Sequence, residues 1–253
     1  MAGRMPIMII FALFIFIDGL SQHVSKFRGR LNRRYINMKK IVGLLSVVSL
    51  GAMLAACSTD PEQTVYDHFE AAVEEESVFA EQQSLLQEAE QQEQGWYEEV
   101  IELGMDEYDS IVSLTDQLLE SVETRRELLE EEKKGIEAGY EEASKAEAEF
   151  ESIDNEETRN LANDVQEAMD NRYESYTTLN GLYAESLDLD EQLYQLLGQE
   201  DLDVSELEDQ IEQVNSKYQE ITDATEQFNS LTDTYNQTKR TFYESADLDV
   251  TFN

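Results

Sequence analysis

The stretch LANDVQEAMDNRYESYTTLNGLYAESLDLDEQLYQLLG (residues 161–198) contains no proline and repeats apolar side chains every three or four positions. Because a helix completes one turn in 3.6 residues, this spacing places the repeated side chains on one face of a single helix. The stretch therefore predicts a long amphipathic helix that ends at Gly198. The apolar stripe consists of Leu161, Val165, Ala168, Tyr176, Leu179, Tyr183, Leu189, Leu193 and Leu196.

Three further stripes of the same spacing cover residues 65–103, 111–153 and 207–242. Asp60-Pro61-Glu62-Gln63 precedes the first of them and is typical of a helix start, with Asp as the cap, Pro in the first turn and Gln completing a capping box. Asp154-Asn155-Glu156-Glu157 predicts a stop followed by a second capped start.

The connections between the stripes are short. Gly104 predicts the end of the first helix and Asp106 the start of the second, while Asp203 or Ser205 caps the fourth. The sequence therefore predicts an all-α fold, an antiparallel up-and-down bundle of four long helices with a left-handed twist. A longer coiled coil with fewer turns is the alternative, and the turn signals at Gly104 and Gly198 disfavour it.

Several polar residues fall on the apolar stripes. Folding the helices antiparallel places Gln82 and Gln83 near the height of Arg125, together with two tyrosines, Tyr183 and Tyr218. One interpretation is a set of buried polar layers that fix helix register. The alternative is a ligand-binding notch. The same folding brings Arg172 level with Glu76, Glu132 and Tyr176.

The charge of the chain is strongly negative and unevenly distributed. The net charge is −38, and after Cys57 only 10 Lys and Arg stand against 55 Asp and Glu. Such a surface repels the phosphates of nucleic acid and anionic lipid headgroups. The sequence therefore predicts no nucleic-acid partner, and any membrane association must come from something other than surface charge.

The single cysteine of the chain, Cys57, follows a signal-like segment. Residues 38–56 have a short basic head and an apolar middle, and they end in Leu54, Ala55 and Ala56 directly before the cysteine. This ending resembles a bacterial lipobox, which implies cleavage before Cys57 and a diacylglyceryl group with fatty acyl chains such as palmitate on its thiol. The alternative is a transmembrane helix, but the run from 41 to 56 is shorter than the roughly 20 residues needed to span a membrane.

These signals give an expected organisation of the chain. Residues 1–37 are predicted to be a non-native upstream extension, because Arg33-Arg34 can be encoded as a ribosome-binding sequence just before Met38; a genuine long signal is the alternative. We expect a signal peptide at 38–56, a lipidated cysteine and tether at 57–60, the bundle at 61–246 and a tail at 247–253.

Five segments resemble the YkyA-like family, described as cell-wall-binding lipoproteins of Bacillus-type Gram-positive bacteria. They are residues 65–69 (VYDHF), 79–83 (FAEQQ), 103–109 (LGMDEYD), 171–176 (NRYESY) and 240–246 (RTFYESA). The resemblance implies a helical extracellular domain on a lipid anchor, with no catalytic residues. This chain has fewer lysines than the family, so contact with anionic wall polymers would need bridging divalent cations, as a hypothesis.

No residue set in the sequence indicates an enzyme, a cofactor or a metal centre. His68 is the one histidine expected in the mature chain, and one histidine builds neither a zinc site nor a catalytic triad. We expect a non-enzymatic lipoprotein on the outer face of the cytoplasmic membrane, facing the wall as a spacer or contact. Its partners would be the membrane, through Cys57, and a wall polymer or another envelope protein. The alternative is an envelope chaperone or assembly factor that binds other exported proteins.

Overall fold

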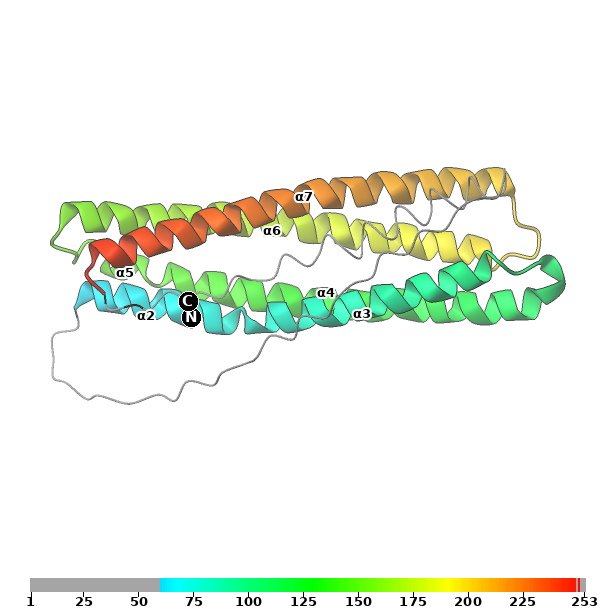
Figure 1. Ribbon diagram of the computed structural model, residues 1–253, viewed down its shortest axis with the longest axis horizontal. Coiled ribbons are helices and arrows are strands. Elements are labelled where there is room, and N and C mark those ends of the chain that lie inside the picture. Colours follow the sequence, from blue (N-terminus) through cyan, green and yellow to red (C-terminus); the bar gives the residue numbers. More distant parts are fainter. Residues whose placement is uncertain (1–59, 249, 251–253) are drawn as a thin grey trace, which may run out of the picture.

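A computed structural model of the chain describes residues 60–248 and 250, and its regular elements there are all helices (Figure 1). The prediction of an all-α bundle is confirmed. The elements are α2 (Pro61–Glu75), α3 (Ser77–Val100), the short 3₁₀ helix η1 (Met105–Glu107), α4 (Tyr108–Ser144), α5 (Glu147–Phe150), α6 (Glu156–Leu197) and α7 (Val204–Ser245).

These elements form four rods, of which α6 and α7 are uninterrupted and the other two are α2 with α3 and α4 with α5. Figure 1 shows α2 and α3 lying along α4, and α6 lying along α7. Contacts between α6 and α7 join Thr158 to Ser245 near one end and Leu189 to Gln210 near the other, so these helices run in opposite directions. The left-handed twist stays a prediction.

Most of the predicted helix caps are present. Asp60, Asn155 and Asp203 each accept hydrogen bonds from backbone N–H groups of the first turn that follows, and Gly198 caps the end of α6. Each such cap satisfies a donor that the helix itself leaves unpaired. Gln63 does not complete the predicted capping box, because its side chain donates to Asp67 instead.

The first turn differs from the prediction. α3 already ends at Val100, while Gly104 lies in extended backbone and α4 begins only at Tyr108, so the predicted boundaries at Gly104 and Asp106 are wrong. The apolar residues Ile101 and Leu103 leave the helix but still pack against the core, which explains why the stripe appeared to continue.

The core consists of two clusters along the bundle. One joins residues such as Phe79, Leu118 and Ile221, and the other joins Val65, Ile153 and Phe242 at the end where α2 begins. Phe79 belongs to the first cluster and Ala72 to the second, with Glu76 between them. α2 and α3 are also interrupted at this residue. The two apolar cores therefore meet at a polar boundary.

The four glycines inside the helices fall into two classes. A Cβ atom added at Gly139 would lie 2.5 Å from Cγ of Glu76, and one added at Gly135 would lie 3.1 Å from the backbone nitrogen of Phe79. These two glycines permit the close approach of α4 to α2 and α3. A Cβ atom added at Gly95 or Gly181 would meet nothing within 4 Å, so packing does not require a glycine at either position.

The predicted upstream extension (1–37), the signal peptide (38–56) and Cys57 lie outside the described residues, as does most of the predicted tail (247–253). Within the described part of the chain, none of the helices combines the length and the apolar character needed to cross a membrane.

Candidate functional site

A buried polar layer surrounds Arg125, which is 1% exposed. Its guanidinium donates to Oε1 of Glu93 at 2.7 Å and to Oδ2 of Asp190 at 3.1 Å. It also donates to the hydroxyl groups of Tyr183 and Tyr218. These residues come from α3, α4, α6 and α7, so the layer ties all four rods together at one height.

The layer contains more carboxyl groups than cations. Glu90 lies 3.7 Å from the same guanidinium, so three carboxyl groups share one arginine. Burial raises the pKa of Asp190 to about 7 against the lowering effect of Arg125, and burial also raises the pKa of Glu90. The second oxygens of Glu93 and Asp190 are buried without a hydrogen-bond partner. The geometry therefore favours retention of a proton in this layer near neutral pH.

Gln82 and Gln83, expected beside Arg125, do not hydrogen-bond to it. Both are half-buried, and Nε2 of Gln83 is buried without a hydrogen-bond partner. Glu90 and Glu93 lie beside Arg125 instead. The heptad spacing Phe79, Leu86, Glu93, Val100 is the sequence signal that could have identified Glu93.

A second polar layer lies at the boundary between the two core clusters. Arg172 donates through both terminal nitrogens to the carboxylate of Glu76, at 2.9 Å for one of them, and through Nε to Thr232. Its guanidinium also lies 5.2 Å from the ring centre of Phe228, within cation–π range. The structure thus brings together Arg172 and Glu76, as the stripes indicated.

Glu132 and Tyr176 lie near this second layer. The hydroxyl of Tyr176 donates to Glu132 at 3.1 Å, and burial raises the pKa of Glu132 to about 8. A third polar group, which the sequence reasoning missed, joins Lys239 to Glu70 at 3.0 Å, with Tyr243 donating to the same carboxylate oxygen. Lys239 lies four residues after Tyr235 and three before Phe242, so the stripe spacing of α7 is the sequence signal that could have identified it.

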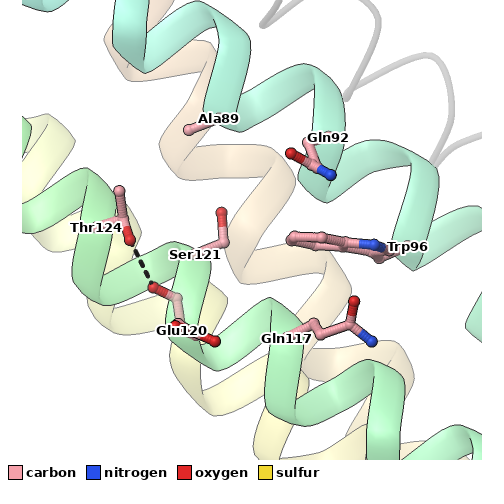
Figure 2. A pocket seen from close by; sticks show the side chains of 7 residues that line it. All are labelled: Ala89, Gln92, Trp96, Gln117, Glu120, Ser121 and Thr124. Atoms are coloured by element: carbon pink, nitrogen blue, oxygen red, sulfur yellow. Dashed lines mark hydrogen bonds between the residues drawn. The ribbon is translucent and has the colours of Figure 1, made fainter.

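A surface pocket of about 340 Å³ lies between α3 and α4 (Figure 2). Figure 2 shows the indole ring of Trp96 between the side chains of Gln92 and Gln117. The pocket is next to the Arg125 layer in sequence, since Gln92 precedes Glu93 and Thr124 precedes Arg125. Its lining consists of Ala89, Gln92, Trp96, Gln117, Glu120, Ser121 and Thr124.

These arrangements differ in what they can do chemically. The Arg125 and Arg172 side chains are no more than 2% exposed, so a solute cannot reach them in the folded bundle. His68 pairs with Glu142 at 2.8 Å, and the described residues contain no cluster of three or more His, Cys, Asp or Glu side chains suited to a metal. The pocket at Trp96 is open to solvent and offers an aromatic ring, amides and hydroxyl groups for binding.

Comparisons with known proteins agree with the fold. A conserved protein of unknown function from Staphylococcus aureus has a crystal structure that matches with a TM-score of 0.61 and 13% sequence identity, covering 75% of this chain and 97% of that one. This similarity supports the bundle fold alone.

Sequence relatives identify the family. A Bacillus subtilis (strain 168) protein, "Uncharacterized lipoprotein YkyA", is 32% identical over 199 residues, which are 78% of this chain and 89% of that protein. The model of the YkyA family, described as "Putative cell-wall binding lipoprotein", matches residues 60–245, which span all four rods. The chain therefore belongs to the YkyA family of lipoproteins.

Proposed function

We propose that the protein is a non-enzymatic lipoprotein, held on the outer face of the cytoplasmic membrane through Cys57, whose helical bundle binds the cell wall. The observation that carries this proposal is the extent of the family match. It covers residues 60–245, which are the bundle itself. This match supports our assignment of the proposed wall contact to the helices.

A lipid on Cys57 supplies the membrane attachment that the bundle cannot. Only 10 basic residues stand against 55 acidic residues after Cys57, so the bundle is repelled by anionic headgroups. Two acyl chains on the cysteine give stable anchoring, because each buried CH₂ group contributes about 0.8 kcal/mol. Cleavage after Ala56 would leave this modified cysteine three residues before Asp60, where the first helix is capped.

The shape of the bundle suits a contact with the wall. α6 contains 42 residues, and at 1.5 Å per residue it is roughly 60 Å long. The anchor would attach where α2 begins, while the turns at 101–107 and 198–203 lie at the opposite end (Figure 1). A site near those turns therefore faces the wall at a distance from the membrane.

Sedimentation with protein-free wall sacculi tests the proposal. The full chain in detergent micelles should pellet with sacculi, because the polypeptide and not the lipid makes the contact. Two parallel samples identify the wall component: sacculi stripped of anionic polymers, and intact sacculi with a chelator. Binding that is lost only in the sample with chelator would assign the contact to bridging divalent cations. A chain that stays in the supernatant with every preparation contradicts wall binding.

The same experiment separates the alternative function. An envelope chaperone would bind unfolded exported proteins and remain in the supernatant with purified sacculi. The described bundle offers little apolar surface for such clients, since Val78, Leu85 and Val204 are its exposed large hydrophobic residues. Wall binding is therefore the function that the fold and the family support best.

A further inference from the structure

We propose that the pocket between α3 and α4 is a saccharide-binding subsite, with Trp96 as its platform and the neutral amino-sugar strands of the wall as its ligand. This inference rests on the proposed wall-binding function and assigns it to a place on the molecule. Nothing in the family match locates the contact within residues 60–245.

The geometry of the pocket fits a small, amphipathic ligand. Trp96 is half-buried and packs against the main core cluster, which holds the ring in place while it lines the pocket. The pocket volume of about 340 Å³ falls at the lower end of the range for small-molecule sites. One or two sugar rings are ligands of this size.

The chemistry of the lining matches a sugar. The carbon-bound hydrogens of a pyranose ring form an apolar face that packs on an indole, while its hydroxyl and acetamido groups need both donors and acceptors. Gln92 and Gln117 offer both through their amides, and the lining also contains the hydroxyl of Ser121. Gln117 donates to the carbonyl of Ser113 and keeps acceptor capacity for a ligand.

The charges around the pocket favour a neutral ligand over an anionic one. Glu120 is a lining residue, and the lining contains no lysine or arginine. The chain as a whole carries a net charge of −38. A phosphate polymer would meet repulsion here without a local cation to offset it, whereas a neutral glycan would not.

Fluorescence tests the subsite directly, because Trp96 is the single tryptophan of the chain. The full chain in detergent micelles is titrated with chitotetraose, the β-1,4-linked tetramer of N-acetylglucosamine, and separately with poly(glycerol phosphate). We expect a saturable change in Trp96 emission with the neutral tetramer at millimolar concentrations or below, and none with the anionic polymer. An unchanged emission with the tetramer, or a response to the phosphate polymer alone, overturns the proposal.

Variants connect the subsite to the wall. Ala89 lines the pocket on α3, so Ala89→Leu places a bulky side chain in the subsite and keeps a strong helix former at that position. Gly95→Leu is the matched control on the same helix, because Gly95 is exposed outside the lining and an added Cβ atom there meets nothing within 4 Å. We expect Ala89→Leu and Trp96→Ala to weaken binding to sacculi at least about tenfold, a change that corresponds to 1.4 kcal/mol. The control should bind like the wild type.

The outcomes distinguish this inference from the function on which it rests. Equal binding of the wild type, Ala89→Leu and Trp96→Ala to sacculi would overturn the subsite and leave wall binding intact. A wild type that binds the tetramer but not sacculi would support the subsite and contradict wall binding. Capture of a folded or unfolded protein by this surface, without any response to saccharide, would also overturn the subsite.

Discussion

Nη1 of Arg125 lies 2.7 Å from Oε1 of Glu93, and both side chains are only 1% exposed. Asp190, on a third helix, shares the same nitrogen at 3.1 Å. Taking such charges out of water is costly, so each depends on its partners remaining in place. The pair therefore fixes the register of α3 along α4, because a shift of one turn would separate a buried arginine from its carboxylates.

Arg125→Leu should destabilise the bundle strongly. Removal of the guanidinium leaves Glu93 and Asp190 buried without their cation, which typically costs about 3–5 kcal/mol. Urea denaturation followed by circular dichroism measures the loss. The triple variant Arg125→Leu, Glu93→Leu, Asp190→Leu should recover most of the stability, since an apolar layer has no charge to desolvate. A mild effect of Arg125→Leu alone would show that water reaches the carboxyl groups of this layer.

Glu132→Gln should stabilise the protein at alkaline pH. Burial raises the pKa of Glu132 from 4.5 to about 8, so the folded state favours the protonated acid. Stability from this group is fully present below pH 4.5 and is lost as pH rises toward 8, at up to about 1.4 kcal/mol per pH unit. At pH 8 we expect Glu132→Gln to raise the free energy of unfolding by roughly 2 kcal/mol.

The control for this pH effect is Glu131→Gln, because Glu131 is exposed and pairs with Lys134 on the surface. The difference between Glu132→Gln and the wild type should shrink toward zero at pH 4.5, while Glu131→Gln follows the wild type throughout. A difference that does not change with pH would contradict the raised pKa of Glu132.

Gly139→Ala and Gly181→Ala should have opposite effects. The added methyl group at Gly139 would meet Glu76 and the carbonyl oxygen of Ala72, and relieving that overlap should cost about 1–3 kcal/mol. At Gly181 the methyl group enters open space, and the gain in helix propensity should stabilise by about 1 kcal/mol. Thermal denaturation of both variants measures the two signs. Equal effects would mean that α4 does not approach α2 this closely.

Added NaCl should raise the unfolding temperature. With 55 acidic residues and 10 basic ones after Cys57, repulsion among like charges opposes the compact state. Salt screens that repulsion over a Debye length of about 8 Å at physiological ionic strength, whereas surface ion pairs lose little because they contribute little. Melting curves between low and high salt check this. A flat or falling trend would show that repulsion is not a major cost.

The sequence was sufficient for the fold because each helix carries its own periodic stripe and most ends carry a cap with a local mechanism. Asn155 and Asp203, for example, cap their helices through side chains that the sequence displays directly. The boundary at Gly104 could not be predicted in the same way. Ile101 and Leu103 continue the apolar pattern past the end of α3, so the periodicity alone does not show where the helix stops.

The candidate site was predictable only in part. Arg125 and Arg172 stand out as cations on apolar stripes, but their partners depend on how the helices align along the bundle. The expected partners of Arg125 were Gln82 and Gln83, whereas the structure places Glu93 against it. The pocket at Trp96 was not predicted. Trp96 was taken as part of the first apolar stripe, whereas the structure has it half-buried and lining a pocket with polar residues of two helices.

The most direct test of the account is the mass of the N-terminal peptide of the protein extracted from bacterial membranes. We predict a chain that begins at Cys57, with the mass of a diacylglyceryl group on its sulfur, and a Cys57→Ala chain without that group. A wild-type chain that retains residues 38–56 and an unmodified thiol would contradict it.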